Sequence, residues 1–309
     1  MTKKSFAVYL SAILAMVFWA LSFIWYKEVL VLYKPVSLVL MRLIISSILL
    51  LTVTASLGRL DRIERKDIKS FVFLSFLSPF LYFLGESYGV SYMSSTLAAV
   101  IIATIPLFSP IGAYYYLKER ISMMNFVGIV VSVVGVALVV FHQGFNITDV
   151  HPIGLGFMLL AVVSALGYSI IIKRLADRYN VFSIVAYQNL IGIFFFLPLF
   201  FFLDFKQFVS VTPTWDVIVP LLNLGVFAST FAFIFFTYAI KNLGISKANI
   251  FTNAIPVLTA IFAYFILKEQ ITPLKMAGIL VVVLGLFLSQ IRKGMLKRIF
   301  KGNSKKGSK

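Results

Sequence analysis

Long apolar runs separated by short polar gaps divide this chain of 309 residues. A helix needs about 20 apolar residues to cross the hydrocarbon core of a bilayer. Ten runs near that length cover residues 6–26, 36–57, 69–90, 95–117, 122–141, 153–172, 182–203, 216–240, 246–267 and 273–291. Only 13% of the residues are charged, against about 25% in soluble domains. The pattern therefore predicts an all-α membrane protein with ten transmembrane helices.

The distribution of lysine and arginine predicts how these helices are oriented. Basic residues gather on the cytoplasmic side of membrane proteins. With a cytoplasmic N-terminus and ten spans, 22 of them lie inside and five outside, while Arg42 lies within a span. We therefore expect both termini in the cytoplasm and a basic cytoplasmic tail at 292–309. This topology accounts for the formal charge of +17, so we expect membrane lipid, and no nucleic acid, as a partner.

The chain also contains an internal repeat, which appears when the sequence is aligned with itself at an offset of 150 positions. Between residues 98–138 and 248–288, 16 of 41 positions are identical without a gap. The matches include Pro106 with Pro256, and Lys118-Glu119 with Lys268-Glu269. The repeat predicts two units, 6–141 with spans one to five and 153–291 with spans six to ten. Because five is an odd number, the second unit would enter the membrane from the opposite side.

Inverted repeats of this kind are typical of secondary transporters, in which two related halves exchange conformations. The alternatives are a duplicated membrane scaffold, and a sensor or structural subunit that binds a ligand without moving it. The sequence favours no enzyme class. It has no P-loop, no cysteine, and two isolated histidines, His142 and His151, that make no convincing metal site. We expect no cofactor and no metal.

Several motifs along the whole chain resemble a known family. They are Trp19-Ala20, Lys27, Pro35, Arg42, Tyr92, Ala98-Ala99, Pro106, Leu117 to Arg120, Gly128, Gly135, Asn253, Pro256, Lys268-Glu269, Gly278 and Gly285. The chain resembles EamA-type members of the drug/metabolite transporter superfamily, which have ten spans and two EamA repeats. The resemblance implies export of small organic metabolites, such as amino acids, or of drugs across the inner (cytoplasmic) membrane, with uptake as the alternative. In one departure, Gln188 occupies the position in span seven that corresponds to Arg42.

Arg42 and Glu86 are the two formal charges well inside the apolar runs. At 1.5 Å per residue, Arg42 lies about 10 Å from the external start of its helix and Glu86 about 7 Å from the external end of its own. Both are therefore expected at a similar depth, facing the protein interior or a wet cavity. One interpretation is a static ion pair between spans two and three. In the other, Arg42 attracts a substrate carboxylate and Glu86 takes up a proton that couples transport, which makes protons a partner.

Aromatic residues offer a second set of candidates. Trp25 and Tyr26 fall at a membrane edge and are expected in the interfacial belt. Trp19 lies deeper and is a candidate for lining an aromatic cavity, and Tyr88 is a further cavity candidate.

Two prolines and a polar stripe mark the fourth and ninth spans. Pro106 and Pro256 lie mid-span, where each is either a packing kink or a gate hinge. Asn249, Thr252 and Asn253 precede Pro256 at spacings of three and four, which places them on one helix face. Such a stripe either bonds neighbouring helices or lines a pore, and the sequence favours lining by Asn249 and Asn253.

Small residues recur on one side of spans five and ten. Gly128, Gly135, Gly278 and Gly285 favour close helix approach. The sequence leaves open whether this packing is inside one chain or at the seam of a homodimer.

Overall fold

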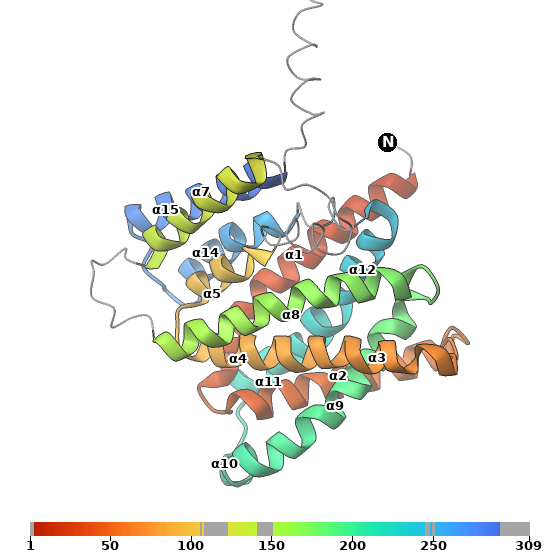
Figure 1. Cartoon of the computed structure of the whole chain (residues 1–309). Coiled ribbons are helices and arrows are strands. Elements are labelled where there is room, and N and C mark those ends of the chain that lie inside the picture. Colours follow the sequence, from red (N-terminus) through yellow and green to blue (C-terminus); the bar gives the residue numbers. More distant parts are fainter. Residues whose placement is uncertain are drawn as a thin grey trace, which may run out of the picture.

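A computed structural model describes residues 3–105, 107, 123–140, 151–244, 248 and 251–290. Every secondary-structure element in these ranges is a helix (Figure 1). The α-helices are α1 (Lys3–Leu30), α2 (Pro35–Ser56), α3 (Ile68–Ser75), α4 (Tyr82–Ser91), α5 (Ser95–Ile102), α7 (Met123–Val140), α8 (Pro152–Ala176), α9 (Val181–Leu199), α10 (Phe205–Ser210), α11 (Trp215–Asn223), α12 (Ala232–Leu243), α14 (Ile255–Ile266) and α15 (Pro273–Gln290). Short 3₁₀ helices lie at Arg65–Asp67 (η1) and Thr252–Ala254 (η6).

Six helical stretches are long and apolar enough to cross a membrane, and the one at Arg65–Ser91 is kinked at Ser78, whose backbone is not helical. They are Phe6–Leu30, Pro35–Ser56, Arg65–Ser91, Pro152–Ala176, Val181–Ser210 and Trp215–Leu243. Shorter apolar helices lie at Phe126–Val139, Thr252–Ile266 and Pro273–Leu288. The prediction of an all-α, multi-pass membrane protein is confirmed.

Three of these stretches contain a π-helical segment next to a proline. The segments are Phe76–Leu81 (η2), Phe200–Asp204 (η4) and Leu224–Phe231 (η5). Pro79 lies inside the first, and Pro198 and Pro220 precede the other two within one turn. Proline removes an amide donor and clashes with the carbonyl four residues earlier, so the regular hydrogen-bond ladder is interrupted there. Each interruption leaves backbone carbonyls free to accept other hydrogen bonds.

Helices α2 and α9 pack against each other and are joined at both ends by aspartates. Asp204, just after α9, accepts hydrogen bonds from the Ser37 amide (2.8 Å) and hydroxyl (3.2 Å) in the first turn of α2. Asp61, in the link after α2, accepts from the Asn180 amide (2.5 Å) at the start of α9, and its own amide donates to Ser183 Oγ (2.8 Å). The end of each helix therefore caps the beginning of the other, so the two helices are antiparallel.

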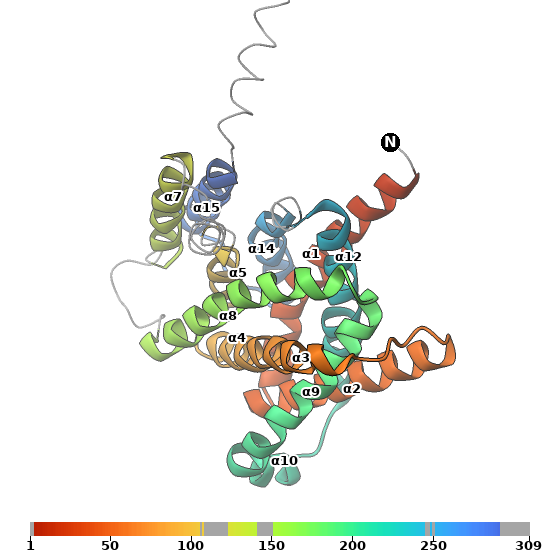
Figure 2. The same ribbon diagram turned by 45° about the vertical axis from the view of Figure 1, so that its right-hand side comes forward.

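Helices α7 and α15 form a close pair at the edge of the bundle (Figures 1 and 2). A Cβ added to Gly135 would lie 2.5 Å from the Val282 amide nitrogen, and one added to Gly285 would lie 2.6 Å from the Ser132 nitrogen. The glycines expected to favour close approach thus pack two helices of the same chain.

The predicted ninth span is broken in its first half. The 3₁₀ turn of η6 precedes α14, so Pro256 is the second residue of α14. In the predicted fourth span, α5 ends at Ile102. Pro106 and Asn249 lie outside the described residues.

Candidate functional site

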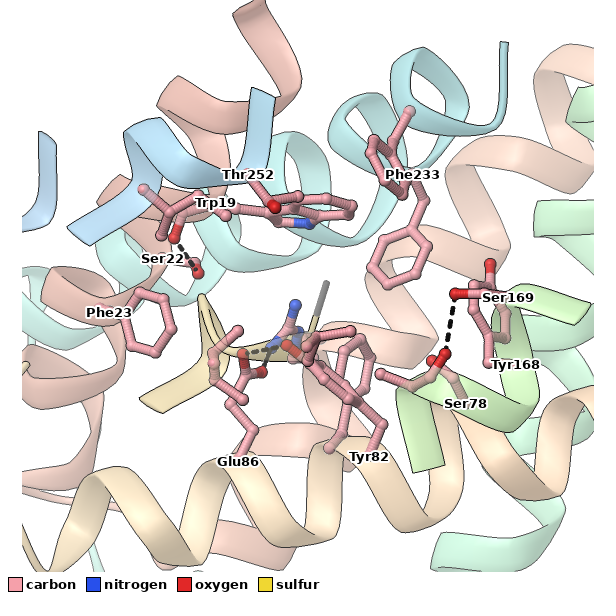
Figure 3. A pocket seen from close by; sticks show the side chains of 17 residues that line it. Trp19, Ser22, Phe23, Ser78, Tyr82, Glu86, Tyr168, Ser169, Phe233 and Thr252 are labelled. Atoms are coloured by element: carbon pink, nitrogen blue, oxygen red, sulfur yellow. Dashed lines mark hydrogen bonds and ion pairs between the residues drawn. The ribbon is translucent and has the colours of Figure 1, made fainter. Parts of the chain in front are cut away.

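A cavity lies among α1, α2, α4, α5, α8, α12, α14 and the η2 and η6 segments (Figure 3). It contains about 780 Å³ of empty space, counting the part that is open to the outside. Its walls are formed by Trp19, Ser22, Phe23, Arg42, Ser78, Tyr82, Phe83, Glu86, Ile102, Ile105, Ala165, Tyr168, Ser169, Phe233, Phe236, Thr252 and Ile255. Most of these side chains are apolar or aromatic, which is typical of sites for small organic ligands.

One wall of the cavity carries the charged side chains of Arg42 and Glu86. Arg42 Nη1 lies 3.8 Å from Glu86 Oε2, and the two residues are only 1% and 5% exposed. The Tyr26 hydroxyl connects them, because it accepts a hydrogen bond from Arg42 Nη1 and donates one to Glu86 Oε2 (2.9 Å). Tyr82 donates to the other carboxylate oxygen, Oε1 (3.0 Å). The structure thus brings Arg42 and Glu86 together, mainly through tyrosine hydroxyls.

The guanidinium group of Arg42 is held in a fixed plane. Its Nε donates to Ser229 Oγ (2.6 Å), and its Cζ lies 4.1 Å from the centre of the Phe83 ring. A cation over an aromatic face is attracted by the ring. A guanidinium has five N–H donors, and the bonds to Ser229 and Tyr26 use two of them.

Trp19 forms part of an aromatic wall. Its ring meets Phe233 edge-on at 5.4 Å and Phe236 at 4.8 Å between centroids. Figure 3 shows Trp19 and Thr252 on one side of the cavity and Glu86 and Tyr82 on the other. The site therefore has an aromatic side opposite a polar side, an arrangement suited to a small amphipathic solute.

The other predicted site residues lie elsewhere. Tyr88 is stacked on Phe157 at 4.8 Å and is not among the lining residues. Asn253 is buried at 2% exposure and also lies off the cavity, whereas its neighbour Thr252 lines it. Because Thr252–Ala254 is a 3₁₀ turn, the expected α-helical stripe is interrupted there.

Sequence reasoning placed one important residue wrongly and missed two others. Tyr26 was expected in the interfacial belt, but it is 0% exposed and bonded to both charges. The correction has a simple cause: a tyrosine near a span end also reaches inward when an ionisable group needs a partner. Tyr82 and Ser229 were not singled out. Tyr82 had a local signal, since it precedes Glu86 by four residues on one helix face.

A model of the EamA-like transporter family matches two stretches of the chain, residues 6–141 and 152–290. An uncharacterized transporter of Archaeoglobus fulgidus is 27% identical over 275 residues, which make up 89% of this chain and 95% of that protein. The uncharacterized transporter YetK of Bacillus subtilis is 27% identical over 258 residues, or 82% of this chain and 77% of the relative.

One solved structure, titled "Crystal structure of protein", shares the fold. Its TM-score is 0.69 at 15% identity, covering 92% of this chain and 98% of that one. The helices and the cavity define a multi-pass membrane protein with a largely apolar cavity among its helices. The chain belongs to the EamA-like transporter family. This membership points to a transporter rather than an enzyme, with small solutes as its partners.

Proposed function

We propose that this protein is a secondary transporter that exports small organic solutes across the cytoplasmic membrane by alternating access. One observation carries the proposal: the cavity lies between the two stretches matched by the family model. Ten of its lining residues come from 6–141 and seven from 152–290. A site between two related halves becomes open to either side when the halves rearrange around it.

The halves are proposed to be inverted repeats of five spans each, 6–141 and 153–291. The reciprocal aspartate contacts of α2 and α9 support this arrangement, because Ser37 and Ser183 occupy corresponding places in the repeat and each is bonded to an aspartate of the other half. Ser37 donates to the Asp204 carboxylate, and Ser183 accepts from the Asp61 backbone amide. The antiparallel course of these two helices is what an inverted repeat requires.

The proposed substrate is a small amphipathic solute with a carboxylate or another anionic group. Arg42 provides the positive charge for this group, and the aromatic side around Trp19 packs against the apolar part of the solute. Glu86 is the proposed coupling residue. Its carboxylate accepts two hydroxyl hydrogen bonds beside the cavity, so uptake of a proton there would change how strongly it holds Tyr26 and, through Tyr26, Arg42.

A cluster of bonds around Glu269 supports a conformation in which the cavity is closed to one side of the membrane. Glu269 accepts hydrogen bonds from the Ser95 amide (2.9 Å) and the Thr96 hydroxyl (2.8 Å), and it pairs with Lys275 Nζ at 3.2 Å. It thereby ties the start of α5 to the link between α14 and α15. The distribution of basic residues puts this cluster on the external side, where it would have to open for outward release.

Counterflow of labelled solutes in proteoliposomes tests the proposal. Candidate solutes come from resistance and sensitivity profiles of cells that overproduce the chain, across amino acids, dipeptides and dyes. Exchange of external label against internal unlabelled solute is expected. Binding without exchange would identify a sensor, and net accumulation by intact cells would identify an uptake carrier.

Single cysteines test the inverted topology, because the chain has no native cysteine. Lys118→Cys and Lys268→Cys occupy corresponding places in the repeat. We expect an impermeant thiol reagent added outside intact cells to label only Lys268→Cys. Labelling of both from the same side would contradict the inverted repeat.

A further inference from the structure

A buried group of polar side chains lies behind the cavity wall, among α2, α9 and the π-helical segment η5. Ser46, Asn189, Ser229 and Thr230 are each at most 2% exposed, and none of them lines the cavity. Buried polar groups are costly unless their hydrogen bonds are made. The pattern of bonds in this group therefore indicates what it holds in place.

Asn189 uses its side-chain amide to hold two elements at once. Its Nδ2 donates to Ser46 Oγ on α2 (2.8 Å) and to the Ser229 carbonyl in η5 (3.2 Å). An amide nitrogen has two hydrogens, so both are used. Neither aspartate nor leucine at position 189 would replace these two bonds.

The π-helical segment is held tightly against α2. Ser46 Oγ lies 2.7 Å from Thr230 Oγ1, and Thr230 donates to the Gly225 carbonyl (2.9 Å). A Cβ on Gly225 would lie 2.5 Å from Ile45 Cγ2, so the Ile45 side chain of α2 fills the space beside this glycine. The Ser229 carbonyl is thus bonded from α9 by Asn189 and from α2 by Ser46 (3.3 Å), and the Gly225 carbonyl is bonded by Thr230 of the same segment.

Ser229 connects this buried polar group to the cavity, because it also contacts Arg42. Its Oγ accepts the hydrogen bond from Arg42 Nε, while its carbonyl is bound by Asn189. The residues are far apart in sequence, since Ser229 and Arg42 are separated by 187 positions. The orientation of the guanidinium plane therefore depends on where Asn189 holds η5.

We propose that Asn189 and Ser229 are positioning residues that set the affinity of Arg42 for an anionic group of the solute. Asn189 fixes the backbone of Ser229, and Ser229 fixes Nε, so that the remaining guanidinium donors face the cavity in one orientation. Two fixed donors favour paired hydrogen bonds to a carboxylate. The inference rests on the proposed role of Arg42 in substrate binding.

Two probes of equal size test this role, 3-phenylpropionate and its neutral amide, 3-phenylpropionamide. Equilibrium binding of each labelled probe is measured with the purified full-length chain in detergent. The wild type is expected to prefer the carboxylate, and Arg42→Ala is expected to lose that preference. Ser229→Ala removes the hydrogen bond that Arg42 Nε donates, and Asn189→Leu removes the bond that holds the Ser229 backbone. Each should reduce the preference about tenfold, and neutral-probe affinity should change little.

A double variant and a matched control separate positioning from general damage. If both residues act through one hydrogen bond to Arg42, the double variant Asn189→Leu/Ser229→Ala should lose no more of the carboxylate preference than the single variant with the larger loss. Ser75→Ala is the control, because Ser75 is equally buried but bonds only to the Phe71 carbonyl of its own helix (2.8 Å). It should keep the wild-type preference. Ser229→Ala removes a single oxygen atom, so it serves as the test if Asn189→Leu does not fold.

The possible failures can be told apart. If the wild type has no preference, or if Arg42→Ala retains it, the carboxylate site of the proposed function is wrong and the inference is wrong with it. If Arg42→Ala loses the preference while Ser229→Ala keeps it, only the positioning role is overturned. Equal losses for both probes, or additive losses in the double variant, would also overturn it.

Discussion

Removing the charges of Arg42 and Glu86 singly and together distinguishes a static ion pair from a working site. The variants are Glu86→Gln, Arg42→Gln and the double variant. Each single variant leaves one buried charge without its partner, whereas the double variant leaves none. Glutamine keeps polar atoms near the tyrosine hydroxyls and alters the volume little at position 86.

The structure sets the expected size of the effect on stability. Two unit charges 3.8 Å apart attract each other by about 4 kcal/mol at an effective dielectric constant of about 20. Leaving one member of a buried pair alone typically costs about 3–5 kcal/mol. In Glu86→Gln, Arg42 keeps its bond to Ser229 and its contact with Phe83, so we expect a loss near about 3 kcal/mol. The double variant should recover most of it.

Two assays are read side by side: thermal unfolding in detergent, and counterflow in proteoliposomes with and without a pH gradient. Both single variants are expected to fold with reduced stability and to lose proton-linked transport. The double variant should regain stability but not transport. Glu28→Gln is the control, because Glu28 is a partly exposed carboxylate near the end of the same helix as Tyr26. It should behave like the wild type.

Two results would refute this reasoning. Recovery of transport together with stability in the double variant would show that the pair only joins α2 and α4. Wild-type transport with unchanged pH dependence in Glu86→Gln would remove the coupling role from Glu86.

Three further predictions follow from the packing around the cavity and at the bundle edge. Trp19→Ala should weaken binding of aromatic solutes about threefold to tenfold, because an aromatic contact contributes about 0.5–1.5 kcal/mol. An equal loss of affinity for non-aromatic solutes, measured by competition binding, would contradict this prediction. In a Ser22→Cys background, Glu269→Gln should increase labelling of the cysteine by an externally added thiol reagent about tenfold, because charged hydrogen bonds contribute about 1.5–3 kcal/mol each. Unchanged labelling would contradict the idea that Glu269 keeps the external side closed. Gly285→Leu should abolish the folded, monodisperse protein in size-exclusion chromatography, since its Cβ would lie 2.6 Å from a backbone nitrogen of α7, whereas Gly156→Leu, with nothing within 4 Å, should not.

Much of the fold was predictable because it depends on local composition. Apolar length identifies the long helices, and the recurrence of glycine in spans five and ten predicted close helix approach, but not which helices meet. The helix breaks were signalled only in part. Pro79, Pro198 and Pro220 are all visible in the sequence, but whether a proline produces a kink or a π-helical segment depends on which neighbours accept the freed carbonyl.

The charged residues of the site were predictable, and their partners were not. Arg42 and Glu86 are identified by the rarity of charge inside apolar runs. Tyr26 lies 60 positions from Glu86 and Ser229 lies 187 from Arg42, so their contacts depend on how distant helices pack. Hydropathy reports that a helix is apolar, but it does not report which side faces its neighbours, and the positions of Tyr88 and Asn253 illustrate this limit.

The paired aspartate caps of α2 and α9 have a consequence for biogenesis. The Ser37 amide in the first turn of α2 obtains its acceptor from Asp204, which the ribosome adds 167 residues later. An amide without a partner in or near lipid is costly, so the N-terminal half made by itself should be a poor substrate for stable insertion and a good one for quality-control proteases. Co-expression of the C-terminal half as a separate polypeptide should rescue it, which would make the two halves dependent on each other for stable insertion.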